Sequence, residues 1–260
     1  MFLKLFKYDF LAIIKKIVYY YIVLVAVAIF AKIVDLILQN TRFHDISNLT
    51  GFLYFMILVV GLLVALVLCM VRYYKNMLSD QGYLTHTLPV KRSQILLAKL
   101  LATLAIEFIT IIVMLISIMI YSFDILYDIV NFVREFFVNA EINPDTYHIV
   151  YILLFAVLLL IIQGVYNVAY VALCLTLGAC HNKNKLAMAF VYYMGINFAL
   201  QILSIVGSIV LIILIDGMKL QFSWGLLYGG LTLICLFELI LVLVAYFVNL
   251  TFLNRKLNLQ

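Results

Sequence analysis

Residues 52–71 read FLYFMILVVGLLVALVLCMV, a run without a single charged side chain. About 20 apolar residues, each adding 1.5 Å, are what an α-helix needs to cross the hydrocarbon layer of a bilayer. The apolar side chains here continue all round a helix, whereas a surface helix of a soluble protein keeps them on one stripe. The stretch therefore predicts a transmembrane helix.

Five further runs of the same kind predict five more spans. The alternating pattern of a transmembrane strand is absent, and lipid cannot satisfy open backbone groups, so helices are expected throughout. The sequence predicts an all-α polytopic membrane protein whose six transmembrane helices form a single transmembrane domain over residues 1–260. The other five runs are 17–38, 97–123, 149–175, 186–215 and 225–251.

Composition supports the same class. Hydrophobic residues make up 68% of the 260 positions and charged residues 11%, whereas soluble domains carry about 25% charged residues. Too few polar side chains remain to cover a water-facing surface. The net charge of +5 is not gathered in one patch, so no nucleic-acid partner is expected. The bilayer is the expected surrounding.

The basic residues predict the orientation. Twelve Lys and Arg residues lie in the termini, in 72–96 and in 176–185, and Lys99 follows directly on the same side, but only Arg42, Arg134 and Lys219 lie in the opposite connections. Lys and Arg are retained on the cytoplasmic side of membrane proteins. Both termini are therefore expected in the cytoplasm and the chain in the cell membrane, with 39–51, 124–148 and 216–224 outside.

The outer segment 124–148 carries apolar residues at helical spacing. This pattern predicts a helix lying on the outer leaflet. A gate over the exit of a pathway is the alternative interpretation. The apolar positions are Ile125, Ile129, Phe132, Val133 and Phe136.

Motifs of common enzyme classes are missing. The sequence has no G-x-x-x-x-G-K-[ST] phosphate loop, no H-E-x-x-H and no G-x-S-x-G. The four histidines fall in separate connections on opposite sides. No enzyme activity, metal or bound cofactor is therefore expected on this chain.

Four polar residues inside the predicted spans are candidates for a pathway. Glu107 and Glu238 each cost about 3 kcal/mol at a helix centre, so each is expected to face protein or water. Asn197 and Gln201 share a helix face four residues apart. These residues line a transport pathway or, as an equally weighted interpretation for the two acids, connect neighbouring helices as neutral groups.

The cytoplasmic connection between the second and third spans contains a second helix signal. Ser79 or Asp80 can cap a short helix, and Pro89 ends it. Such a helix would expose Tyr83, Leu84 and Leu88 for docking into a groove of a soluble partner. Taken alone, the residues favour a simpler interpretation, an interfacial loop anchored by its tyrosines, Tyr73, Tyr74 and Tyr83.

Three stretches resemble the permease subunits of ABC transporters, in the exporter-type group common in Gram-positive bacteria. The first stretch is 6–10, and the second is the first cytoplasmic loop. The third is the tail 256–259. Within the loop the likeness rests on 74–76, Gly82-Tyr83-Leu84, Thr87-Leu88-Pro89-Val90 and Lys99-Leu100-Leu101. The family often has an acidic pair before the Gly-Tyr, where this sequence has Asp80-Gln81.

The resemblance implies a permease that works with a separate ATPase subunit. ATP and Mg²⁺ would bind to that subunit, and a second permease copy or a paralogue would complete the pathway. The loop would be the coupling helix, seated in a cleft of the ATPase. Carried over position by position, its docking residues are Asp80, Gly82, Tyr83, Leu84, Thr87, Leu88 and Pro89.

Two other function classes remain open. One is a proton-coupled secondary carrier that uses Glu107 and Glu238 as proton-binding groups. No internal repeat and no paired Gly- or Pro-broken spans of the kind found in many carriers support it. The other is a non-transport membrane subunit with a role in assembly, immunity or sensing.

Overall fold

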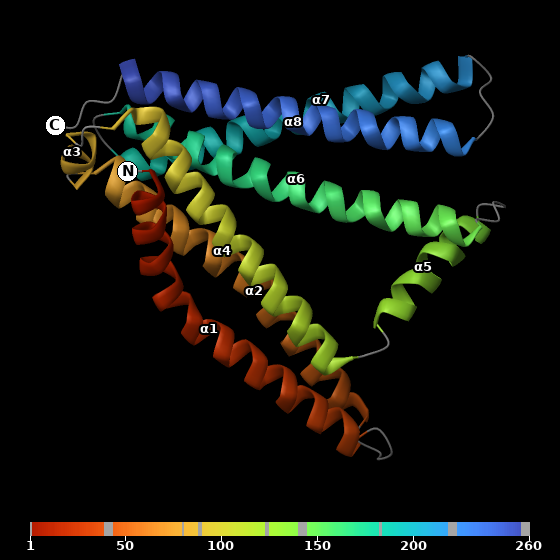
Figure 1. The fold of residues 1–260 in the computed structure, drawn as a ribbon. Helices are drawn as coiled ribbons and strands as arrows, with labels where there is room; N and C mark the ends of the chain where they lie inside the picture. The colour runs from red at the N-terminus through yellow and green to blue at the C-terminus, as the bar shows by residue number, and fades with distance from the viewer. Residues whose placement is uncertain are drawn as a thin grey trace. The chain divides into compact units, whose positions relative to one another are not determined.

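The computed structural model describes residues 2–38, 44–79, 81–87, 90–122, 125–139, 145–181, 184–217 and 223–255. All regular secondary structure in these ranges is helical, which confirms the all-α prediction (Figure 1). The helices are α1 (Phe2–Leu38), α2 (His44–Met77), α3 (Gln81–His86), α4 (Arg92–Tyr121), α5 (Ile125–Asn139), α6 (Thr146–Ala179), α7 (Lys185–Gly217) and α8 (Trp224–Arg255).

Six of these helices, α1, α2, α4, α6, α7 and α8, are long and apolar enough to cross a membrane. Five of the six predicted runs lie wholly within them, and of the run 97–123 residues 97–121 lie in α4. α3 and α5 lie where the two short helices were predicted. Two helices extend well beyond the predicted spans. α1 begins at Phe2 rather than at residue 17, and α2 begins at His44 rather than at residue 52. Hydropathy marks only the part of a helix that lies in hydrocarbon.

The chain divides into two compact units. The first contains residues 1–72 and 94–153, and the second contains residues 73–93 and 154–260. α1, most of α2, most of α4 and α5 belong to the first unit. α3, most of α6, α7 and α8 belong to the second. The prediction of a single transmembrane domain remains a prediction.

The first unit is built on α1, α2 and α4, which lie alongside one another (Figure 1). Ile17 and Leu24 of α1 and Ile106 of α4 are completely buried between these helices. Hydroxyl groups in this core are paired: Tyr21 with Thr110 at 2.7 Å, and, in a second pair, the hydroxyls of Tyr54 and Ser117 at 2.8 Å. An unpaired hydroxyl in an apolar environment would be costly, so these pairs fix the register of the three helices.

One close helix approach depends on a glycine. The Tyr20 hydroxyl of α1 donates a hydrogen bond of 2.6 Å to the carbonyl oxygen of Ile57 in α2. One turn further along α2, Gly61 lies against the same tyrosine ring, and a Cβ there would collide with it. Small residues allow such close approach of membrane helices. The contact between α1 and α2 therefore requires glycine at position 61.

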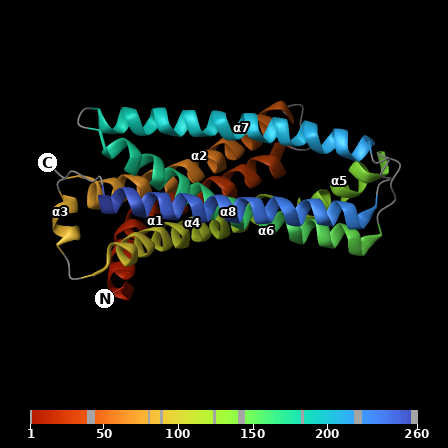
Figure 2. The same cartoon turned by 90° about the horizontal axis from the view of Figure 1, so that it is seen from above.

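In the second unit, α6 packs on α8 through Ala169, Leu173 and Ala245. α6 and α7 form a tight hairpin, in which a Cβ on Gly178 would collide with the backbone of Ala189. The turn contains Asn184 with a φ of 54°, a left-handed conformation that asparagine tolerates better than most residues. At the end of the unit where α8 finishes lies α3, in both views (Figures 1 and 2).

The helix α5 has the two-faced character expected of an interfacial helix. Ile129, Phe132 and Phe136 lie on one side, and the last two are 71% and 63% exposed. Arg134 and Glu135 are also exposed. Large apolar side chains that are this open on a short amphipathic helix suit the boundary between headgroups and acyl chains.

The Gly61 contact gives a test of the packing. We expect Gly61→Ala to lower the thermal unfolding midpoint of the detergent-purified protein, because the added methyl group forces the Tyr20 ring away from its hydrogen bond. Overpacking of this kind costs about 1–3 kcal/mol. Gly164→Ala is the matched control, since nothing lies within 4 Å of its added Cβ. Equal midpoints for the two variants would contradict the helix contact.

Candidate functional site

Residues 73–93, here called the connecting segment, join two long helices of the first unit but pack in the second. At its start, the amides of Leu78 and Ser79 bond to the carbonyl oxygen of Tyr74, at 2.9 Å and 3.1 Å. The Met77 and Leu78 side chains are buried. The Gly82 amide then bonds to the carbonyl oxygen of Ser79 at 2.7 Å. These contacts turn the chain directly from α2 into α3.

The predicted cap at Ser79 has a different form in the structure. Its hydroxyl donates to the carbonyl oxygen of Lys75 at 2.6 Å, so it closes the last turn of α2. It is the backbone carbonyl of Ser79 that accepts a bond from α3. A serine hydroxyl at the end of a helix can bond back to the carbonyl four residues earlier, and here that bond replaces the expected one.

α3 presents one exposed aromatic side chain among its described residues. Tyr83 is 63% exposed. The residue before it, Gly82, is buried. Thr87 is exposed, and its amide bonds to the carbonyl oxygen of Tyr83 at 3.1 Å. The side chain of Leu84 and the residues Asp80, Leu88 and Pro89 lie outside the described part of the chain.

A buried polar triad anchors the start of the connecting segment. The Tyr73 hydroxyl lies 3.1 Å from the Thr176 hydroxyl of α6, and Thr176 donates to Oδ1 of Asn249 in α8 at 2.9 Å. All three side chains are buried. A buried polar network whose members are all paired is rigid and specific in geometry. Tyr73 is therefore locked to α6 and α8.

The end of the connecting segment is anchored by Arg92. Its guanidinium Nη1 donates to the carbonyl oxygen of Leu253 at 2.7 Å and to that of Asn254 at 3.4 Å. The last carbonyls of a helix have no partner inside the helix, and a cation there also interacts favourably with the helix dipole. Arg92 caps α8, so both ends of the connecting segment are attached to the same unit.

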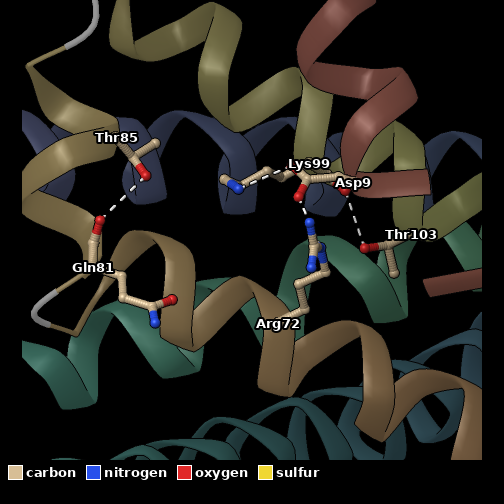
Figure 3. A network of polar contacts seen from close by, with 6 residues as sticks. All are labelled: Asp9, Arg72, Gln81, Thr85, Lys99 and Thr103. Carbon is tan, nitrogen blue, oxygen red and sulfur yellow. Dashed lines mark hydrogen bonds and ion pairs between the residues drawn. The ribbon is translucent and has the colours of Figure 1, made fainter. Parts of the chain in front are cut away.

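An ion-pair cluster lies in the first unit, at the end of α2 (Figure 3). Asp9 of α1 accepts from Nε of Arg72 at 2.8 Å through one carboxylate oxygen and from Nζ of Lys99 at 3.0 Å through the other. The Asp9 and Lys99 side chains are 10% and 7% exposed, and that of Arg72 is 30% exposed. The cluster carries a net charge of +1 and joins α1, α2 and α4.

Sequence reasoning missed the triad and the cluster. Thr176 and Asn249 are single polar residues at the ends of apolar runs, and nothing local pairs them with Tyr73, which is 176 positions from Asn249. Asp9 did carry a signal, because it is the only acid among the first 16 residues, where basic side chains recur. An acid in such a stretch can be expected to have a partner.

The two intramembrane acids lie in different units. Glu107 is on α4 and Glu238 is on α8, and the two are not part of one described site. Each has one buried carboxylate oxygen without a hydrogen-bond partner in the described structure: Oε1 of Glu107 and Oε2 of Glu238. Buried polar atoms in proteins are usually paired, so both acids stay candidates for a role in binding.

Asn197 and Gln201 are exposed on α7, the least covered of the candidate spans. In its most apolar stretch 6% of the residues are buried, against 28% in α2 and in α4. The two amides border a shallow groove on α7 together with Met194 and Phe198. Their role as pathway residues is neither supported nor contradicted by this position.

The described residues do not form a metal site. Among the residues that the structure describes, no three His, Cys, Asp or Glu side chains are grouped as a metal site requires. Comparisons with protein-family models, curated protein sequences and solved structures give no match. The connecting segment is the most distinctive feature of the described structure: a short helix with an exposed aromatic side chain, held between two anchored ends.

The ion-pair cluster gives a second test. We expect Asp9→Asn to destabilise the protein by about 3 kcal/mol, because it leaves Lys99 buried without a counter-charge. Lys99→Met should cost less, since Asp9 keeps Arg72. The double variant should be more stable than Asp9→Asn alone. Unfolding by SDS titration in detergent measures all three, and additive losses would contradict a direct pair.

Proposed function

We propose that the chain is the membrane-spanning permease subunit of an ATP-driven exporter and that it works with a separate ATPase subunit. The observation that carries the proposal is the connecting segment. It exposes Tyr83 on a short helix and is held at one end by the buried triad and at the other by Arg92. A segment anchored in this way transmits a displacement of α3 to α6 and α8 instead of absorbing it.

The charge distribution supports a cytoplasmic position for this segment. Thirteen Lys and Arg residues against three favour cytoplasmic termini and a cytoplasmic connection 72–96. A soluble ATPase could then reach α3. The sequence around it, Gly82-Tyr83-Leu84 and Thr87-Leu88-Pro89, resembles the coupling loop of ABC permeases and motivates the assignment to that class.

A second permease copy or a paralogue is the other proposed partner. Asn197, Gln201 and Ser204 follow one another on α7 at spacings of four and three residues, and all three are exposed. Amide and hydroxyl groups that face hydrocarbon are unfavourable unless they find partners, and such groups connect helices in membranes. A second subunit against this face would provide these partners.

Replacing Tyr83 and Leu84 together by Asp tests the docking assignment. We expect the ATPase to be lost from the affinity-purified complex, because two carboxylates cannot enter an apolar cleft without a large desolvation cost. Mass spectrometry identifies the ATPase by its phosphate-loop sequence, and vanadate-sensitive ATP hydrolysis measures its amount. Transport should be lost in parallel.

The matched control is Tyr127→Asp on α5, since Tyr127 is 69% exposed and lies in a different connection. It should leave the ATPase bound. Both variants must be inserted in the membrane at the level of the parent protein. Unimpaired ATPase binding by the Tyr83 and Leu84 double variant would falsify the docking assignment.

A proton-coupled carrier is the second candidate, and the unpartnered carboxylate oxygens of Glu107 and Glu238 favour it. It predicts that the purified chain in vesicles without ATP accumulates a solute under a pH gradient alone. Glu238→Gln should abolish this uptake, because the amide cannot carry the proton. Vesicles without a gradient are the control. If no gradient-driven uptake is detected, this candidate is excluded.

A further inference from the structure

The helix α1 is too long for one bilayer crossing. Its 37 residues span roughly 55 Å at 1.5 Å each, whereas the hydrocarbon layer is about 30 Å thick. The apolar span begins near residue 17, so the first 16 residues lie outside the hydrocarbon. Figure 1 shows a bend in α1 after its first turns.

This N-terminal part of α1 has two distinct faces. Asp9, Ile13 and Ile17 follow at intervals of four residues and are buried against the first unit. On the opposite side, Lys4, Lys7 and Lys15, here called the basic face, are exposed. The helical repeat places positions three, eight and eleven apart on one side of a helix.

The charge of the basic face is not compensated by α1 itself. Asp9 is the only acid among residues 1–16, and its carboxylate lies on the buried side, bonded to Arg72 and Lys99. The cluster retains a net charge of +1, so it adds to the positive charge nearby. An anion is therefore the complementary ligand for this surface.

The surroundings of the basic face indicate which anion. The same side of α1 continues into the apolar span as Val18 and Ile22, which are 39% and 62% exposed. Towards the N-terminus, Leu3 and Tyr8 are 76% and 70% exposed. The lysines thus continue a lipid-facing side of the helix and alternate with exposed apolar side chains. This pattern suits the headgroup layer, where ammonium groups bind phosphates and apolar side chains reach the acyl chains.

We propose that the basic face binds anionic phospholipids of the leaflet on the N-terminal side of the membrane. The proposal rests on the membrane-spanning fold and does not depend on the ATPase. Asp9 gives the binding a structural consequence, because it connects this segment directly to Arg72 at the end of α2. Lipid bound on the outward side of α1 therefore holds a helix that is ion-paired to the residue just before the connecting segment.

Brominated lipids that quench tryptophan fluorescence test the proposal. Trp224 is the only tryptophan, so Tyr8→Trp combined with Trp224→Phe places a single probe beside the basic face. The protein is reconstituted in bilayers of phosphatidylglycerol and phosphatidylcholine at a fixed ratio, with one or the other lipid brominated. Each lysine close to an anionic bilayer increases the affinity for anionic lipids about fivefold. We therefore expect brominated phosphatidylglycerol around the probe to be enriched at least about twofold over the bulk.

Two sets of variants complete the test. Replacing Lys4, Lys7 and Lys15 by Gln should bring the quenching by the two lipids close to equality, whereas replacement by Arg should preserve the preference. A probe at Phe132 on α5, in place of Tyr8, should show no preference. Equal quenching by the two lipids in the parent probe protein would overturn the proposal and would favour an acidic protein as the occupant of this face.

Discussion

Hydrocarbon offers no hydrogen-bond partner, and this constraint shapes the whole molecule. A helix satisfies its backbone groups within its own segment, which accounts for the six long apolar helices among the described residues. The same constraint applies to side chains. Inside the first unit, polar groups occur in pairs such as Tyr21 with Thr110, and each pair also fixes how two helices meet. The same hydrogen bond thus satisfies a polar group and fixes how two helices pack.

The polar contacts that involve three side chains, the ion-pair cluster and the triad, lie near the ends of the apolar spans. Arg72 and Tyr73 are neighbours in sequence, yet Arg72 pairs with Asp9 in the first unit and Tyr73 with Thr176 in the second. The boundary between the two units in the sequence thus falls inside the last turns of α2. The connecting segment begins at this boundary. A site for force transmission is therefore better defined by its anchors than by the exposed helix alone.

Composition and periodicity were sufficient to predict the six spans and the amphipathic helix at α5, whereas for the segment of α3 the residues alone favoured a loop and the resemblance to ABC permeases favoured the short helix that is found. They fell short where structure depends on distant pairs. The extension of α1 to Phe2 follows from the burial of Ile13 and the pairing of Asp9, neither of which raises local hydropathy. The contacts of Tyr73 with Thr176 and of Arg92 with Leu253 join positions 103 and 161 residues apart, and the pattern of residue types along the chain does not indicate which distant residues pair.

The contacts of the connecting segment also bear on biogenesis. Tyr73 and Arg92 are synthesised early, but their partners Asn249 and Leu253 lie at the end of the last helix. The connecting segment cannot reach its final structure until α8 has left the ribosome and entered the membrane. A truncated or incompletely inserted chain would lack the finished surface around Tyr83. The contacts that hold the connecting segment therefore form only after α8 has been synthesised.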